Sequence, residues 1–191
     1  VRHIQNFTDV DDKIIERAKK LGTSEPEVAQ KNIEAYFHWM KVLNVLPADV
    51  YPRVTDHIPE IQRLVGRLLE EKKAYVADGD VYFAVRQFPA YGRLSKRNID
   101  DLEAGARVEV GERKRDPLDF ALWKKAQTQH IMRWPSKWGE GFPGWHLECS
   151  AMSKKYLGET FDIHGGGMDL LFPHHECELA QAVALQGKES V

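Results

Sequence analysis

The sequence predicts an α/β fold. Apolar residues recur at helical spacing in three stretches before residue 73, and residues 74–115 carry hairpin and strand signals. Later in the chain, the strand-like run Phe161–His164 leads directly into Gly165-Gly166-Gly167. A strand followed by a glycine loop is how α/β folds bring backbone amides close to a nucleotide. We therefore predict a nucleotide-binding core that also contains a smaller β-rich unit.

Composition and charge limit the class of protein further. The 191 residues are 42% hydrophobic and 29% charged, which is ordinary for a globular protein with one core. A net charge of −2 gives no overall positive field for nucleic acid. No apolar run is long enough for a membrane span, and no signal peptide is visible. Two cysteines do not make a disulfide framework, so we expect a reducing, cytoplasmic location. The chain begins at Val1 without Met, so we expect a piece of a longer protein.

The first 73 residues read as one strand and three helices. Residues 1–7 alternate as a strand does, and Thr8 is a candidate cap for a helix that ends at Gly22. A capping box at residues 24–27 opens a helix to about Leu43. Its expected buried stripe is Ile33, Phe37, Met40 and Leu43. A third helix starts at Thr55 or Asp56, with one apolar side made of Ile58, Ile61, Leu64, Val65, Leu68 and Leu69.

The middle of the chain changes character. Two strand-like runs flank Asp78-Gly79, which is a strong hairpin signal. Residues 106–110 read as another short strand, and the basic run at 111–115 reads as an exposed loop. We expect Asp116-Pro117 to open a helix that carries Phe120, Ala121, Trp123 and Lys124. Residues 134–144, rich in Trp, Gly and Pro, predict an ordered loop, and a helix follows from Trp145 to Gly158.

Three residues near the end of the chain are candidate zinc ligands: Cys149, His174 and Glu178. His174 and Glu178 are four residues apart, so on a helix after Pro173 they share one face, and Cys149 comes from a separate element. Three protein ligands leave an open position, as catalytic or substrate-binding zinc sites do. A fourth ligand could be Cys177, His175 or a residue outside the chain. The alternative is that Cys149 is a small buried apolar residue and that the histidines are core or capping groups.

A family resemblance rests on several of these stretches. GWHLECSAM and FDIHGGGMDLLFPHHECE are similar to cysteinyl-tRNA synthetase, a class I aminoacyl-tRNA synthetase. NFTDVDDKI, DVYFAVRQFPAYGRLSKRN and AGARVEVGERKRDPLDFALWKKA resemble further parts of that family, in order. The resemblance implies a Rossmann-like nucleotide-binding domain with an inserted β-rich connective domain. It divides the chain into core segments at 1–73 and 129–191 and the insertion at 74–128.

The resemblance also implies an activity. The family activates L-cysteine with ATP and Mg²⁺ to cysteinyl adenylate and transfers the cysteine to tRNA(Cys), while a zinc ion selects the substrate thiol. By motif match, Cys149, His174 and Glu178 are three of the four zinc ligands. The fourth, a Cys, would lie upstream of Val1, and the position matching Cys177 is not a ligand. The matched substrate-binding residues are Thr8, Trp145, His164, Gly165, Gly166 and Asp169, and we expect a monomer.

Two departures and two alternatives accompany the resemblance. The family's H-I-G-H and K-M-S-K-S signatures, which bind ATP, are absent from this sequence. We therefore expect no catalytic residue in this chain and no adenylate formation by the chain alone. One alternative is the related cysteine:glucosaminyl-inositol ligase of mycothiol synthesis, which does not use tRNA. The other is a non-catalytic zinc-binding or RNA-binding module, whose mark would be a closed four-ligand site that includes Cys177.

Overall fold

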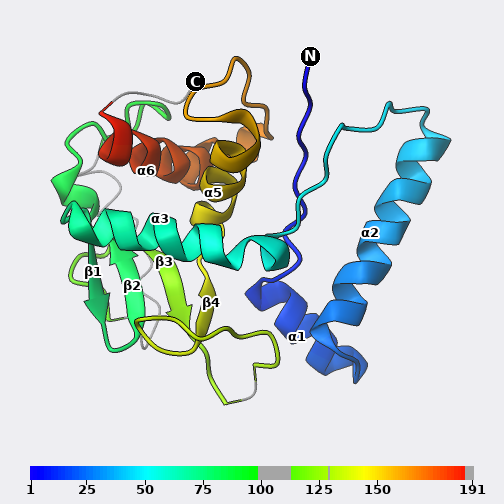
Figure 1. Ribbon diagram of the computed structural model, residues 1–191, viewed down its shortest axis with the longest axis horizontal. Helices are drawn as coiled ribbons and strands as arrows, with labels where there is room; N and C mark the ends of the chain where they lie inside the picture. The colour runs from blue at the N-terminus through cyan, green and yellow to red at the C-terminus, as the bar shows by residue number, and fades with distance from the viewer. Residues whose placement is uncertain (99–112, 129, 188–191) are drawn as a thin grey trace.

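The computed structural model describes residues 1–98, 113–128 and 130–187 as an α/β arrangement of helices around one small sheet (Figure 1). Its helices are α1 (Asp12–Leu21), α2 (Glu25–Val42), α3 (Ile58–Glu70), α5 (Trp145–Leu157) and α6 (Glu176–Gln186). Its strands are β1 (Ala74–Ala77), β2 (Asp80–Phe83), β3 (Phe120–Lys125) and β4 (Gly141–Pro143). Short helical turns lie at Val54–His57, Val85–Gln87, Met168–Leu170 and Leu171–His175.

The sheet is antiparallel throughout and its strands follow the order β1-β2-β3-β4. The predicted hairpin is confirmed: Ala74 pairs with Phe83 and Ala77 pairs with Asp80. Asp78 and Gly79, which join the two strands, both have positive φ, at 52° and 93°. A two-residue hairpin loop of the type I′ class requires that conformation at both positions, which is why Asp-Gly is favoured there.

One hydrophobic cluster joins the sheet to three helices. Leu68 from α3, Trp123 from β3 and Leu147 from α5 are fully buried in it, and Ala180 of α6 joins them. Figure 1 shows α3 running across the molecule between the sheet and the α5–α6 pair. The expected apolar side of α3 is confirmed, since Ile58, Ile61, Leu64, Val65 and Leu68 are buried, with Leu69 packed against the cluster. This core fixes the positions of α5 and α6.

The N-terminal segment differs from the prediction. Residues 1–7 form only isolated parallel bridges, Ile4 with Val50 and Phe7 with Arg53, instead of a continuous strand. The two segments still share backbone hydrogen bonds, because the amides of Gln5 and Phe7 donate to the carbonyls of Val50 and Pro52. Thr8 is not the helix cap: Asp11 accepts a hydrogen bond from the Lys13 backbone amide and caps α1. Gly22 ends α1 with φ of 64°, as predicted.

Helix α2 begins with the predicted capping box, in which Ser24 and Glu27 satisfy each other's backbone amides. Its expected buried stripe is only partly correct. Ile33 is buried with Val28 and Ala29, but Phe37 and Leu43 are 41% and 65% exposed. In Figure 1 the C-terminal end of α2 stands away from the sheet and its covering helices, and Phe37 packs against the rings of Phe7 and Tyr51.

Two further elements were predicted incorrectly. Residues 120–125 form β3 instead of a helix, because β2 and β4 pair with it on both sides, and tertiary pairing overrides local propensity. Residues 161–164 are not a strand: no described segment pairs with them, and Ile163 is 80% exposed. The predicted strand at 106–110 lies outside the described residues. None of the described helices has the length and apolar character needed to cross a membrane.

The segment after β2 is held on α6. The buried carboxylate of Glu176 accepts hydrogen bonds from the backbone amides of Gly92 and Ser95, at 2.9 and 2.8 Å. The Tyr91 hydroxyl lies 3.2 Å from the sulfur of Cys177. The first turn of α6 therefore fixes residues 91–95 close to the start of that helix, which also carries Glu178.

Candidate metal and substrate site

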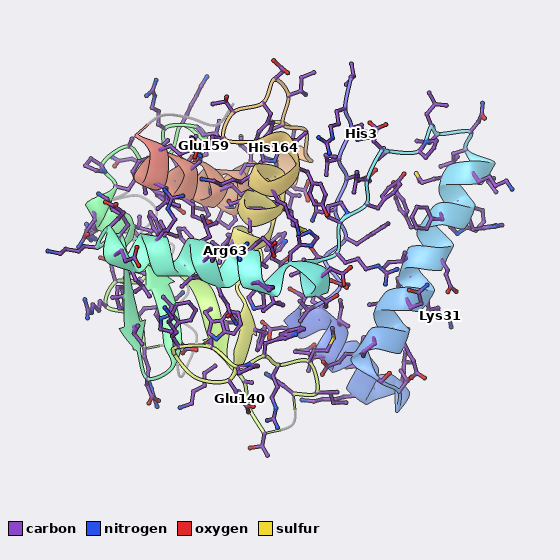
Figure 2. All side chains as sticks on the ribbon, in the orientation of Figure 1. His3, Lys31, Arg63, Glu140, Glu159 and His164 are labelled. Atoms are coloured by element: carbon purple, nitrogen blue, oxygen red, sulfur yellow. The ribbon has the colours of Figure 1, made fainter. Side chains whose placement is uncertain are left out.

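The candidate site lies where the first turns of α5 and α6 meet. Helix α5 begins after Gly144, close to the backbone of β3 at Ala121, and carries Cys149 in its second turn. His174 precedes α6 by two residues and Glu178 lies in its first turn. Figure 2 labels His164, from the loop between the two helices, beside the α5 ribbon. The packing of α5 against α6 therefore brings together residues that are 25 or more positions apart.

The three predicted zinc ligands converge. Ligand atoms of Cys149, His174 and Glu178 all lie within 4.8 Å of one another. The Cys149 sulfur is 3.7 Å from His174 Nε2, and that nitrogen is 3.7 Å from Glu178 Oε2. His174 and Glu178 are buried and Cys149 is half-buried. The predicted convergence of these three side chains is therefore confirmed, while their role as metal ligands stays a prediction.

The electrostatics of this group suit a cation. Burial raises the pKa of Glu178 to about 8 and raises the pKa of the Cys149 thiol well above its usual value. Burial also lowers the pKa of His174 to about 4, which keeps its imidazole neutral. Glu178 Oε2 is buried and accepts no hydrogen bond among the described residues. A half-buried thiol, a neutral imidazole and a carboxylate oxygen without a hydrogen bond are donors that a divalent metal would satisfy together.

Neighbouring side chains orient His174. The indole of Trp145 stacks on its ring, with centroids 4.4 Å apart and planes 25° from parallel. His146 Nδ1 lies 3.0 Å from His174 Nδ1, which leaves Nε2 facing Cys149 and Glu178. A metal-binding histidine commonly has its second ring nitrogen fixed in this way. Asn6, from the N-terminal segment, places its side-chain oxygen 3.8 Å from the Cys149 sulfur.

The remaining predicted substrate residues divide into two groups. His164 lies 3.5 Å from Glu178 through Nε2 and Oε2, and Gly165 and Gly166 line the same small cavity as Cys149. Thr8 and Asp169 do not line that cavity. Thr8 instead donates a 3.1 Å hydrogen bond to the buried Glu148 on α5, and Asp169 is exposed beside Gly167.

Two cavities adjoin the site. The smaller, about 220 Å³, is lined by Asn6, Cys149, His174 and the glycine loop. The larger, about 490 Å³, is lined by residues of α5 and α6, by residues 93–94 and by Glu178. Four residues line both cavities: Ser153, Phe161, His164 and His175.

Cys177 lies apart from the candidate metal ligands. Its sulfur lies against the Tyr91 hydroxyl in the hydrophobic cluster, and burial raises its pKa above the usual value. In the described part of the chain, neither group of converging metal donors includes it.

Comparison with known proteins bears on the whole chain. A family model for the catalytic domain of class I (C) tRNA synthetases matches residues 1–191. This chain belongs to that synthetase family.

Curated members of the family are similar over nearly all of the chain. Identity is 61% over 188 residues to a cysteine--tRNA ligase of Desulforudis audaxviator, which covers 98% of this chain and 39% of that protein. Cysteine--tRNA ligases of Geobacillus thermodenitrificans and Aquifex aeolicus are 56% and 58% identical over the same share of this chain. The chain covers 40% and 38% of those two proteins. It therefore spans well under half the length of these synthetases.

Sequence reasoning missed several contacts in this synthetase site. His164, His175 and Glu178 form a second group of donors within 4.8 Å of one another. The paired histidines at 174–175 are a visible signal for this second group. Nothing in the sequence indicated that Glu148 would accept a hydrogen bond from Thr8, because the two are 140 positions apart.

Proposed function

We propose that this chain is the zinc- and cysteine-binding part of a cysteine--tRNA ligase. The parent activity would be activation of L-cysteine with ATP and Mg²⁺ to cysteinyl adenylate, followed by transfer to tRNA(Cys). The observation that carries the proposal is the convergence of Cys149, His174 and Glu178, with Glu178 Oε2 buried and without a hydrogen bond. Relatives named cysteine--tRNA ligase, at 56–61% identity across nearly the whole chain, support the choice of reaction.

The proposed metal is zinc, held by the Cys149 thiolate, His174 Nε2 and a Glu178 oxygen. These thiolate, imidazole and carboxylate donors are a set that zinc accepts. When bound, zinc would supply a position that prefers a thiolate to a hydroxyl, and this preference would separate cysteine from serine where shape alone discriminates poorly. Binding requires that Cys149 and Glu178 release their protons, and their raised pKa values make that release unfavourable without a metal.

The chain's other residues would position the substrate. Trp145 holds His174 by stacking and would form a wall for the cysteine side chain. Thr8, fixed by Glu148, would present its hydroxyl to the substrate. His164, Asp169 and the glycines at 165 and 166 would form the nucleotide side, where residues without a Cβ let backbone amides approach an adenylate.

The finer architecture belongs to the same proposal. We assign residues 1–73 and 129–191 to a Rossmann-like catalytic core and residues 74–128 to a connective insertion. Support comes from the family match across all 191 residues and from the change to antiparallel strands after residue 73.

The test is zinc content by elemental analysis, with and without added L-cysteine or L-serine. We expect about one zinc per chain, held more tightly with L-cysteine and unaffected by L-serine. Cys149→Ala should lose this zinc, and Cys177→Ala is the matched control that should keep it. Zinc that is independent of both L-cysteine and Cys149 would overturn the proposal and would indicate a closed structural site.

A further inference from the structure

The second donor group combines two histidines that the proposed zinc site does not use with Glu178, which both groups share. His164, His175 and Glu178 offer two imidazoles and a carboxylate, with one ligand atom from each lying within 4.8 Å of the others. The two imidazole rings have centroids 5.3 Å apart. Two histidines and one glutamate are a donor set that zinc accepts in proteins with three protein ligands and an open position.

The placement of His175 depends on a glycine. A Cβ built on Gly166 would overlap the His175 ring at Cε1 and Nε2. Only a residue without a side chain lets the loop approach this ring so closely. The glycine loop therefore holds His164 and His175 together over Glu178.

An ion can reach this group from solvent. The His164 side chain is 36% exposed, and all three residues line the cavity of about 490 Å³. Glu178 Oε2 lies 3.5 Å from His164 Nε2 and 3.7 Å from His174 Nε2, so one oxygen faces both donor groups. Paired metal sites about 3.5–4 Å apart are common in enzymes.

We propose that His164, His175 and Glu178 form a second site for a zinc-like divalent ion, which shares Glu178 with the Cys149 group and opens into the larger cavity. It is the weaker of the two sites, because it has no thiolate and its ion lies near another cation. The site goes beyond the proposed function, since cysteine selection needs only one ion. An ion bound here would stand between the two cavities.

Cobalt(II) titration of the metal-stripped chain tests the proposal, with bound metal measured by equilibrium dialysis. Cobalt bound to Cys149 produces a thiolate charge-transfer band in the near ultraviolet, whereas cobalt at the second site produces only weak visible bands. We expect about two ions per chain at saturation, with the thiolate band complete after about the first.

Variants separate the two sites. His175→Gln and His164→Gln should each remove the second ion and keep the thiolate band, whereas Cys149→Ala should lose the band and keep one ion. His38→Gln, on the exposed face of α2, is the matched control and should bind both ions. Circular dichroism checks folding, and the more exposed His164 carries the test if His175→Gln unfolds.

Saturation at one ion in the unaltered chain would overturn the proposal. Persistence of the second ion in both histidine variants would also overturn it. Failure of the cysteine-binding proposal gives a different result: the thiolate band would be missing or insensitive to Cys149→Ala, while an ion lost with His164→Gln would still be bound.

Discussion

The indole of Trp145 and the imidazole of His174 lie face to face, with ring centroids 4.4 Å apart. Trp145 starts α5 and is 40% exposed, so one face of the indole packs on His174 while part of the ring remains open to solvent. The Trp145 side chain thus lies between solvent and His174, which is a candidate metal ligand.

Replacement of Trp145 should therefore weaken metal binding. We expect Trp145→Ala to lower zinc affinity by about 10–100-fold, because His174 loses the contact that orients it. Trp145→Phe, which keeps a stacking ring, should lose much less. Competition with a chromophoric chelator measures both affinities, and equal losses in the two variants would contradict the role of stacking.

The pH dependence of stability should report on Glu178. Burial raises its pKa to about 8 from 4.5, so the metal-free folded chain holds a proton that the unfolded chain has released. The contribution of Glu178 to the free energy of unfolding should therefore fall as pH rises from about 4.5 to about 8, and then level off.

The comparison with Glu178→Gln isolates this effect. His146 and His174, with pKa values lowered to about 3 and about 4 from 6.5, act with the opposite sign, but only below about pH 6.5. Urea unfolding in chelator between pH 6.5 and 8 should show a decline in the unaltered chain and a flatter profile in Glu178→Gln. Parallel profiles would mean that Glu178 does not hold the proton.

The Thr8 hydroxyl should stabilise the chain through Glu148. Thr8→Val keeps the shape but leaves the buried Glu148 carboxyl without this 3.1 Å partner. We expect a loss of about 1–3 kcal/mol in the free energy of unfolding, the usual cost of an unsatisfied buried polar group. Thr8→Ser restores the hydroxyl and should recover most of the loss. Urea denaturation measures both, and a stable Thr8→Val beside a destabilised Thr8→Ser would show that the methyl group, not the hydroxyl, stabilises the chain.

Two glycine positions should respond in opposite directions. In Gly144→Ala the new methyl overlaps the backbone carbonyl of Ala121 in β3, which cannot move without disturbing the sheet. We expect destabilisation of about 1–3 kcal/mol, as for overpacking elsewhere. Gly66→Ala, inside α3 with open space around it, should stabilise by about 0.5–1 kcal/mol. Thermal unfolding tests the pair, and stabilisation by both would show that the start of α5 can shift freely.

Local signals predicted much of the fold. The hairpin at Asp78-Gly79, the capping box at Ser24 and the end of α1 at Gly22 each follow from a few adjacent residues, and all three are confirmed. Local signals do not predict secondary structure that depends on pairing between distant segments. Residues 120–125 form a strand because β2 and β4 flank them, and sequence spacing cannot reveal that pairing.

In the candidate site, too, local spacing predicted some features, and others depend on how distant helices pack. The spacing of His174 and Glu178 predicted a shared helix face, and their convergence with Cys149 is confirmed. The part played by His146, which lies 3.0 Å from His174 between ring nitrogens, could not be predicted, because it depends on how α5 and α6 pack. The metal, its ligands and the substrate residues remain predictions that the experiments above test.

Three consecutive residues at the start of α6 face three different surroundings. Glu176 holds the amides at residues 92 and 95, Cys177 packs against Tyr91, and Glu178 faces the metal donors. Successive helical residues point about 100° apart, so turning α6 by one position would move all three side chains into the wrong environment at once. A buried carboxyl group, a sulfur and a candidate metal-binding side chain together therefore define the rotational setting of α6.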